Sequence, residues 1–348
     1  MIQRKRVMHS KRKTVMKKIA VLGAGLTGAT VAATLIQKGY QVTVFDKGRA
    51  AGGRMSSKRT EQGYLDMGAQ YFTARSDAFK RQVKLWLDDG QVEIWPCSTA
   101  LLSLAEGLSS LKTSEDEQAR FIGVPSMQSP VKALLQGVPL INGCRIQKLD
   151  YQQQGWTLFS DNGLSYTGFD AVLLTLPPAQ VQQLVVQSTL PELFDFADEL
   201  LEPCWAVALH TDARPVQDAI FCQHPKLRFI SHQQHKTGRK SCYILHFNAA
   251  FSALYLHEPE KFWFAEATAI LRQELHIHQE ITPLVAHRWL YASQNEQVAA
   301  PGLIALPNLK LWAGGDWSYG GRVENAYLAG LNLANAVIEQ DKSQQETP

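Results

Sequence analysis

A glycine-rich turn between two apolar segments, within residues 18–46, constrains the fold of this chain more than any other feature. The segment KIAVL (18–22) has the apolar, β-branched composition of a buried strand. GAGLTG follows at once, then a segment of helical composition that ends at Gly39, and YQVTVFD predicts a second strand ending at Asp46. Strand, helix and strand in this order and length predict a βαβ nucleotide-binding unit.

The three glycines of this turn have separate physical roles. Gly23 permits the tight turn out of the strand, Gly25 leaves room for a pyrophosphate against the backbone, and Gly28 lets the helix pack closely on the strands. The helix N-terminus offers free N–H groups and the positive end of its dipole to the phosphates. Asp46 stands where a carboxylate accepts hydrogen bonds from the adenosine ribose and repels a 2′-phosphate. The unit therefore predicts a dinucleotide ligand.

Two further glycine segments favour FAD over NAD. DKGRAAGGRMSSKR places Gly52, Gly53 and Arg54 just past the second strand, where a glycine pair can wrap around a longer dinucleotide and a guanidinium can face phosphate. In YLDMGAQYFTAR, residues 68–70 would bring backbone N–H groups to a flavin edge. The alternatives are an ordinary solvated loop for the first segment and a plain turn between strands for the second.

The C-terminal region contains a third signal. NLKLWAGGDWSYGGRVENAYLAGLNLANAVIE predicts a strand at 310–313, a glycine loop, and a helix at 323–339. Asp316, at the end of the strand, would accept a bond from a ribityl or pyrophosphate-side hydroxyl. The helix start near Val323 and Asn325 would direct its positive end at the O2/N1 region of the flavin. Alternatively, the helix only completes the packing on the sheet.

These motifs carry a resemblance to a known family. GAGLTG, DKGRAAGGRM, DMGAQYFTAR, FIGVPSMQSPVKALL, HRWLYA and GDWSYGGRVENAYLAG resemble the FAD-dependent oxidoreductases related to monoamine oxidase, and among them the bacterial renalase-like proteins. The resemblance covers nearly the whole chain after Met16, although residues 185–280 match only loosely. It implies an α/β fold, with a Rossmann-like FAD-binding domain of the glutathione-reductase/amine-oxidase type and an inserted α+β substrate domain containing an antiparallel sheet. It also implies that the backbone near Ile146 brackets the adenine.

The cofactor-binding set and the domain limits follow from the motifs and the resemblance together. The predicted FAD contacts are Gly23, Gly25, Leu26, Thr27, Gly28, Asp46, Lys47, Gly53, Arg54, Gly68, Ala69, Gln70, Ile146, Gly315, Asp316, Val323 and Asn325. No cysteine lies in the C-terminal motif, where covalently flavinylated members of the family carry one, so we expect non-covalent FAD. The predicted units are an FAD-binding domain at 16–75, 131–190 and 300–340, a substrate domain at 76–130 and 191–299, a basic tail at 1–15 and a polar tail at 341–348.

The substrate domain is expected to contain an antiparallel sheet flanked by helices. CWAVALHT, LRFISH and SCYILHFN have strand-like composition, and PEKFWFAEATAILRQELHI has helix-like composition. Aromatic and basic residues gather in this region, and they predict a substrate pocket that includes Tyr71, Trp205, His246, Arg288 and Trp289. In this pocket Arg288 would face an anionic group such as a phosphate. The alternative for each residue is an ordinary core or surface position on its strand.

Flavin chemistry requires no dedicated general base, and the sequence identifies no catalytic residue. The renalase resemblance implies an oxidase that transfers hydride from a reduced or isomeric dihydronicotinamide dinucleotide to FAD, with molecular oxygen as acceptor. A flavin amine oxidase acting on a small amine is the alternative. A non-catalytic protein that binds FAD or NAD is the alternative from another class.

The charge distribution gives no support to a nucleic-acid-binding fold. The net charge is +3, but residues 1–18 contain eight Lys or Arg and no acid, which leaves 27 basic against 32 acidic residues in the remainder. The basic character therefore belongs to the N-terminal tail. Either Met16 is the natural start of the protein, or the tail is a weak membrane-surface or nucleic-acid arm.

The remaining composition favours a cytoplasmic protein. Five scattered cysteines form no CxxC pair and no metal-ligand spacing, so they fit reduced thiols. The closely spaced histidines, 232 with 235 and 276 with 278, lack a third ligand, and no metal is expected. No apolar run approaches the roughly 20 residues of a membrane span. We expect small-molecule partners, with no nucleic acid and no membrane.

Overall fold

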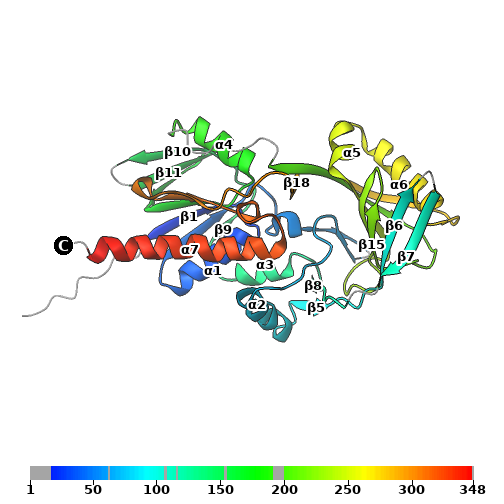
Figure 1. Cartoon of the computed structure of the whole chain (residues 1–348). Helices are drawn as coiled ribbons and strands as arrows, with labels where there is room; N and C mark the ends of the chain where they lie inside the picture. Colours follow the sequence, from blue (N-terminus) through cyan, green and yellow to red (C-terminus); the bar gives the residue numbers. More distant parts are fainter. Residues whose placement is uncertain are drawn as a thin grey trace, which may run out of the picture.

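The computed structural model of the chain describes residues 17–61, 63–105, 108–114, 117–152, 155–190 and 200–346. The predictions for the basic tail at 1–15 and for Met16 lie outside the described residues. Figure 1 shows two sheets side by side, with α1 and α7 on the left-hand sheet and α5 and α6 on the right-hand one.

A six-stranded sheet forms the first part. Its strand order is β19-β20-β13-β1-β2-β9, and every neighbouring pair is parallel except β19 with β20. The strands are β1 (Lys18–Leu22), β2 (Gln41–Phe45), β9 (Leu140–Ile141), β13 (Ala171–Leu174), β19 (Ile304–Leu306) and β20 (Leu311–Ala313). The strand predicted at 310–313 is confirmed, but it begins one residue later because Lys310 adopts a left-handed backbone with φ 52°.

Both faces of this sheet are covered, as its uniformly apolar strands require. Within β1, Ile19 and Val21 belong to one core, and Ala20 and Leu22 belong to the other. The first face carries helices α1 (Leu26–Gln37), α2 (Asp77–Asp88), α3 (Ser129–Leu134) and α7 (Val323–Glu346). The second face carries α4 (Pro178–Gln187) and an antiparallel sheet of β10 (Ile146–Gln152), β11 (Gly155–Ser160) and β12 (Ser165–Phe169).

Helix α7 extends past the predicted end at residue 339 and continues to Glu346. Asp341 in the added part pairs with Lys17 and accepts a hydrogen bond of 2.8 Å from the Tyr40 hydroxyl. Burial and this carboxylate raise the pKa of Tyr40 above its ordinary value. The last turns of the helix are therefore fastened to the start of β1 by charged and polar side chains, a tertiary contact that the polar composition of 341–348 does not indicate.

A seven-stranded sheet forms the second part. Its order is β18-β14-β17-β16-β15-β6-β7, antiparallel throughout except for the parallel pair β15 and β6. The strands are β6 (Thr99–Ala105), β7 (Leu108–Ser114), β14 (Leu201–His210), β15 (Ala219–Gln223), β16 (Leu227–His232), β17 (Tyr243–Phe247) and β18 (Thr282–Gln294). The predicted strands and the predicted helix, which is α6 (Glu260–Glu274), are confirmed, and a short helix α5 (Ala249–Leu254) lies beside it.

The two faces of this sheet have different partners. Trp205, Val207 and Leu209 of β14 lie on the outer face and pack with α6. Ala206 and Ala208 lie on the inner face, which packs on β4 (Gly63–Asp66) of a hairpin whose first strand is β3 (Ser57–Thr60). The inner face therefore meets the chain directly after the glycine-arginine loop.

The chain returns to the first part before it enters the seven-stranded sheet. Phe79, Val83 and Trp86 of α2 share a core with α1 and α7, and the rings of Phe79 and Tyr327 lie 5.2 Å apart. A small sheet of β5 (Val92–Ile94) and β8 (Phe121–Gly123) follows on this side. The domain limits predicted at 75 and 130 stay predictions, although α2 packs with the helices of the first part. No helix in the described ranges is long and apolar enough to cross a membrane.

Candidate dinucleotide and substrate site

The first glycine loop connects β1 to α1, and the packing around it explains its glycines. Gly23 has φ 111°, and a Cβ there would lie 2.8 Å from the Thr175 hydroxyl oxygen. A Cβ on Gly28 would lie 1.9 Å from the carbonyl oxygen of Gly23. At Gly25, by contrast, a Cβ would meet nothing within 4 Å. Two of the glycines are thus required by the protein's own packing, whereas Gly25 borders open space.

The start of α1 has donors available for an anion. Gly25 is the N-cap, and no side chain of the described residues caps it. The helix bond nearest the N-terminus runs from the Ala29 N–H to the Gly25 carbonyl, at 2.9 Å. The N–H groups of Leu26, Thr27 and Gly28 therefore precede the helical hydrogen-bond ladder, as at anion-binding helix N-termini.

Asp46 ties the end of β2 to this loop. One carboxylate oxygen accepts from the Ala24 N–H and the other from the Gly48 N–H, both at 2.6 Å. Each oxygen retains a further lone pair that a hydroxyl can use. The Asp46 carbonyl accepts from Cys144 N–H at 2.9 Å, which brings the backbone leading to the buried Ile146 beside it. Lys47, next in sequence, is exposed.

The second glycine loop lies directly over the first. The Gly52 N–H donates to the Ala24 carbonyl at 2.9 Å. Gly53 has φ 53°, and a Cβ there would lie 3.2 Å from the Cα of Gly25. Two glycines from separate motifs are thus in close backbone contact beside the start of α1. The backbone of these two loops and the start of α1 form a cradle without side chains, which suits a pyrophosphate.

Three of the predicted cofactor segments meet at Arg54. Its guanidinium forms a two-bond pair with Asp316, of which the Nη1–Oδ2 bond measures 2.9 Å. Its carbonyl accepts from the Ala69 N–H at 3.0 Å, and a Cβ on Gly68 would lie 2.0 Å from that carbonyl oxygen. The sequence predicted ligand contacts for Arg54 and Asp316 separately, and it did not indicate that they pair. The pair positions the loop after Gly315 against the second glycine loop.

The loop that leads into α7 has an unusual backbone and is held by a side chain of the helix. Gly320, Gly321 and Arg322 all have positive φ, and Arg322 at 124° occupies a region that strains a non-glycine residue. Asn325 donates to the carbonyls of Tyr319 and Gly321 at 2.7 and 3.1 Å. The side chain of Asn325 thus shapes this loop, and Val323 beside it is half-buried.

The segment 68–70 leads directly to the inner face of the seven-stranded sheet. The Met67 carbonyl accepts from Trp289 Nε1 at 2.8 Å and contacts His246 Nε2 at 3.2 Å. Burial lowers the pKa of His246 to about 4, so its ring is neutral at pH 7 and Nε2–H is the donor. The His287 ring stands edge-on to Trp289, with centroids 4.4 Å apart, and burial lowers its pKa to about 4 as well.

Tyr71 joins Trp95 and Phe229 in an aromatic wall made by these three rings. The Tyr71 ring centroid is 6.0 Å from both of the other rings. Phe229 pairs with His246 across β16 and β17, so it belongs to the inner face. The Arg120 guanidinium lies 5.2 Å from the centre of the Tyr71 ring. The sequence predictions missed Trp95, Phe229 and Arg120. For Phe229, the only indication was that successive side chains of the strand LRFISH point to opposite faces of the sheet.

The structure separates Trp205 and Arg288 from the other predicted pocket residues. They are cross-strand partners on the outer face, and both donate to the Leu256 carbonyl at 3.4 Å. Trp205 stacks on Trp263, with ring centroids 4.9 Å apart, and is 6% exposed. The inner face therefore brings together Tyr71, His246 and Trp289, and the other two predicted residues lie on the far side of the sheet.

A buried ionic cluster, made by Asp66, Lys236 and Arg239, lies behind residues 68–70. Both Arg239 Nη2 and Arg239 Nε lie 3.0 Å from Asp66 Oδ2, and Lys236 Nζ lies 3.7 Å from the same oxygen. All three side chains are fully buried. The sequence predictions did not single out any of the three.

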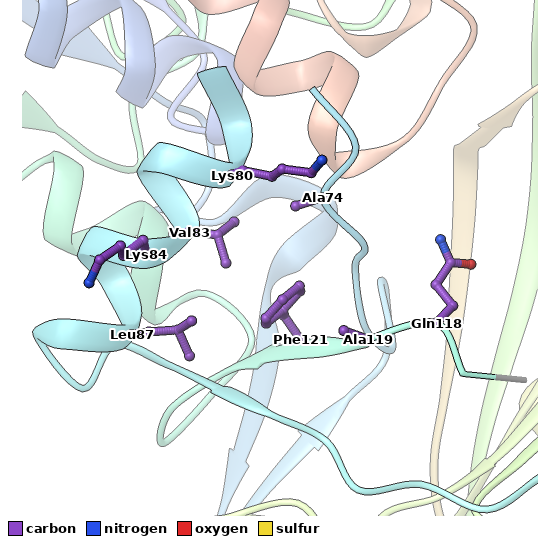
Figure 2. Close-up of a pocket in the computed structure, with 8 residues that line it drawn as sticks. All are labelled: Ala74, Lys80, Val83, Lys84, Leu87, Gln118, Ala119 and Phe121. Atoms are coloured by element: carbon purple, nitrogen blue, oxygen red, sulfur yellow. The ribbon is translucent and has the colours of Figure 1, made fainter. Parts of the chain in front are cut away.

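A separate surface pocket of about 300 Å³ lies between α2 and the chain leading into β8. In Figure 2, Val83 and Leu87 of α2 lie opposite Phe121, with Lys80 and Lys84 also on the α2 side. The pocket shares no residue with the predicted cofactor or substrate sets. Within the described ranges, no group of three or more His, Cys, Asp or Glu side chains is arranged to hold a metal ion.

Sequence comparison gives local matches at the N-terminal part of the chain. Residues 21–85 match the NAD(P)-binding Rossmann-like domain family. The chain is 52% identical over 50 residues to 4,4'-diapophytoene desaturase (4,4'-diaponeurosporene-forming) of Staphylococcus haemolyticus, a stretch that is 14% of this chain and 10% of that protein. It is 45% identical over 51 residues to the desaturase of Staphylococcus aureus strain Newman, 15% of this chain and 10% of that protein. The chain thus matches about a tenth of the length of these curated relatives.

Structural comparison extends over nearly the whole chain. An oxidoreductase from Methanosarcina mazei aligns with a TM-score of 0.67 at 14% identity, covering 91% of this chain and all of that one. Putrescine oxidase with bound putrescine aligns with a TM-score of 0.69 at 11% identity, covering 93% of this chain and 99% of that one. At these identities the likeness concerns the fold. Residues 21–85 are therefore similar to the NAD(P)-binding Rossmann-like domain family, and the chain as a whole has the α/β Rossmann-like fold of amine-oxidase-type structures.

Proposed function

We propose that this protein is an FAD-dependent oxidoreductase. The observation that carries the proposal is the contact between the two glycine loops, where Gly53 faces Gly25 beside the uncapped start of α1. A protein that used these loops only for packing would need glycine at 23 and 28, but not at 25, where a Cβ meets nothing. The fold that the chain shares with oxidoreductases over most of its length supports the same proposal.

The proposed FAD contacts follow the geometry from one end of the cofactor to the other. The first glycine loop and the start of α1 would hold the pyrophosphate, and Asp46, Lys47 and the backbone near Ile146 would hold the adenosine. Arg54, Gly315 and Asp316 would line the middle, and residues 68–70, Val323 and Asn325 the flavin. With no cysteine in the GDWSYGG motif, the attachment we propose is non-covalent. When bound, the flavin would accept a hydride from the substrate and pass the electrons on to an acceptor.

The chain's own residues would bind and orient the substrate on the inner face. His246 and Trp289 both contact the Met67 carbonyl, and together with Tyr71 they would form the side of the pocket opposite the flavin. His246 is neutral, half-buried and engaged with the Met67 carbonyl, so it suits positioning rather than proton transfer. The aromatic rings would exclude water from the reacting carbon.

The charges around the aromatic wall of Tyr71, Trp95 and Phe229 favour an anionic, planar hydride donor over an amine. Lys236 lies 4.5 Å from the Trp95 ring centre, and Arg120 lies 5.2 Å from that of Tyr71. The cluster of Asp66, Lys236 and Arg239 carries a net positive charge, which disfavours a cationic amine nearby. A reduced or isomeric dihydronicotinamide dinucleotide carries negative phosphates and is the substrate class we propose, with oxygen as acceptor. The alternative, oxidation of a small amine, draws on the fold shared with putrescine oxidase.

Anaerobic mixing of the FAD-loaded protein with candidate donors tests this proposal. We expect aged NADH, which contains isomeric dihydronicotinamides, to bleach the flavin absorbance rapidly, and putrescine and other small amines to leave it unchanged. Bleaching by amines alone would support the alternative, oxidation of a small amine, and contradict the proposed substrate class. A flavin that neither class reduces would favour the non-catalytic alternative, and protein that takes up no FAD would overturn the proposal altogether.

A further inference from the structure

The ionic cluster of Asp66, Lys236 and Arg239 joins the two parts of the molecule. Asp66 ends β4, whereas Lys236 and Arg239 lie on the turn between β16 and β17 of the seven-stranded sheet. This turn also pairs with β4 through the Tyr64 N–H, which donates to the Gly238 carbonyl at 3.1 Å. The packing of the glycine loops does not require a charged side chain at position 236.

Lys236 is bonded to the end of the 68–70 segment. Its ammonium donates to the Gln70 carbonyl at 2.8 Å and to the Gln70 side-chain oxygen at 3.1 Å. Gln233 Nε2 donates to the same side-chain oxygen at 3.0 Å. On the other side, the Ala69 N–H is held by the Arg54 carbonyl. The segment is thus fixed between the second glycine loop and Lys236.

The cluster contains one positive charge more than its carboxylate can balance. Asp66 faces two cations, and the other groups acting on Lys236 are the thiols of Cys97 and Cys242. Burial raises the pKa of both thiols, that of Cys242 to about 12, so they are neutral at pH 7. Burial, opposed by Asp66 and assisted by Arg239, lowers the pKa of Lys236 to about 8. An uncompensated buried charge is costly unless a further anion approaches it.

We infer that Lys236 is a positioning residue for the flavin: it fixes the 68–70 segment from inside the protein, and its surplus charge stabilises negative charge on the bound, reduced flavin. The inference rests on the proposed function, because it needs FAD beside residues 68–70. It does not depend on the identity of the substrate. The charge acts through the Gln70 backbone, so Lys236 itself need not touch the cofactor.

The midpoint potential of the bound flavin tests this role without a turnover assay. Lys236→Met keeps the approximate length of the side chain and removes its charge. Below pH 8 and at a fixed applied potential, we expect the ratio of reduced to oxidised flavin in this variant to be about tenfold lower than in the wild type. That factor corresponds to about 30 mV for a two-electron couple. Lys240→Met is the matched control, since Lys240 is half-buried on the same turn and outside the cluster; its potential should equal that of the wild type.

The pH dependence separates charge from packing. Because Lys236 loses its proton above its pKa of about 8, the difference between wild type and Lys236→Met should shrink as the pH rises past 8. Equal potentials at pH 7, or a difference that does not change with pH, would overturn the inference. If Lys236→Met does not fold, the wild type alone decides, because its potential should change slope at or above pH 8, and a constant slope would contradict the role.

Failure of this inference is distinguishable from failure of the proposed function. A wild-type protein that takes up no FAD overturns the proposed function, and with it the premise of this experiment. A wild-type protein that binds FAD, with a potential that Lys236→Met leaves unchanged, overturns only the role of Lys236.

Discussion

The first glycine loop and the inner face of the seven-stranded sheet are built in opposite ways. Around Gly23 and Gly28, backbone atoms approach so closely that any side chain would collide. On the inner face, side chains such as Trp289 and His246 form the surface, and they reach across to a single carbonyl at Met67. The first region depends on the absence of side chains, and the second depends on which side chains a strand turns inward.

This difference determines how each region tolerates change. A glycine loop fails through steric collision, which no rotamer can relieve when the opposing atom belongs to the backbone. A sheet face changes by substitution, and consecutive residues of a strand have unrelated roles because they point to opposite sides.

The largest effect is expected for Gly28→Ala. The added methyl would lie 1.9 Å from the Gly23 carbonyl oxygen, so α1 must move away from β1. We expect a loss of about 5 kcal/mol in the free energy of unfolding, or no folded protein. Chemical denaturation measures it, and a variant with the stability of the wild type would show that this close packing is not required.

A smaller but still large loss is expected for Trp205→Ala, at about 3–5 kcal/mol. Trp205 stacks on Trp263 in the outer-face core, so stability should fall while the substrate KM of the protein that remains folded stays unchanged. Arg288→Ala, its exposed neighbour on the same face, should alter neither quantity. A raised KM in either variant would mean that the outer face also contacts substrate.

Within the glycine loop, Gly25→Ala should behave unlike Gly28→Ala. Its φ of −79° suits alanine, and the new methyl meets no protein atom within 4 Å. We therefore expect unchanged thermal stability of the apoprotein but FAD binding that is weaker by tenfold to a hundredfold, about 1.4–2.8 kcal/mol. Titration with FAD measures the affinity, and an unchanged Kd would remove Gly25 from the proposed cradle.

The smallest effect concerns the acid sensitivity of the inner face. The folded-state pKa of His246 is about 4, below the ordinary value of about 6.5, so the folded protein binds fewer protons between these limits. This histidine's share of the stability is therefore complete above pH 6.5 and is lost as the pH falls toward 4. On acidification from pH 7 to 5 the wild type should lose about 1–2 kcal/mol more than His246→Gln. Equal losses would mean that folding does not lower the pKa of His246.

The sequence predicted the glycine loop well because its signals are local. Gly23, Gly25, Gly28 and Asp46 lie within one βαβ unit, and the constraints on each arise from turn geometry and from the next strand. The sequence predicted Gly25 and Gly53 separately as cofactor contacts, and it did not show that they touch. The pairing of Arg54 with Asp316, 262 residues apart, required the folded chain.

The sequence did not show which of the predicted pocket residues lie on the same face of the sheet, for a physical reason. In HRWLYA the sequence offers Arg288 and Trp289 side by side, and both types suit a substrate site. Only the pairing of β18 with β14 decides which of the two faces inward. Lys236 gave no signal at all, because a lysine in a polar turn is ordinarily exposed.

The amino-acid sequence by itself determined the first glycine loop, because a backbone that approaches its neighbours as closely as at Gly23 and Gly28 admits only glycine, and such glycines have recognisable spacing. It also predicted β14, β16 and β17 of the seven-stranded sheet from their strand-like composition. Only the tertiary structure decided which face of that sheet meets the 68–70 segment, and which lysine is drawn inside beneath it. Strand register and domain contact set the environment of these side chains, and neither is encoded within the few residues around them.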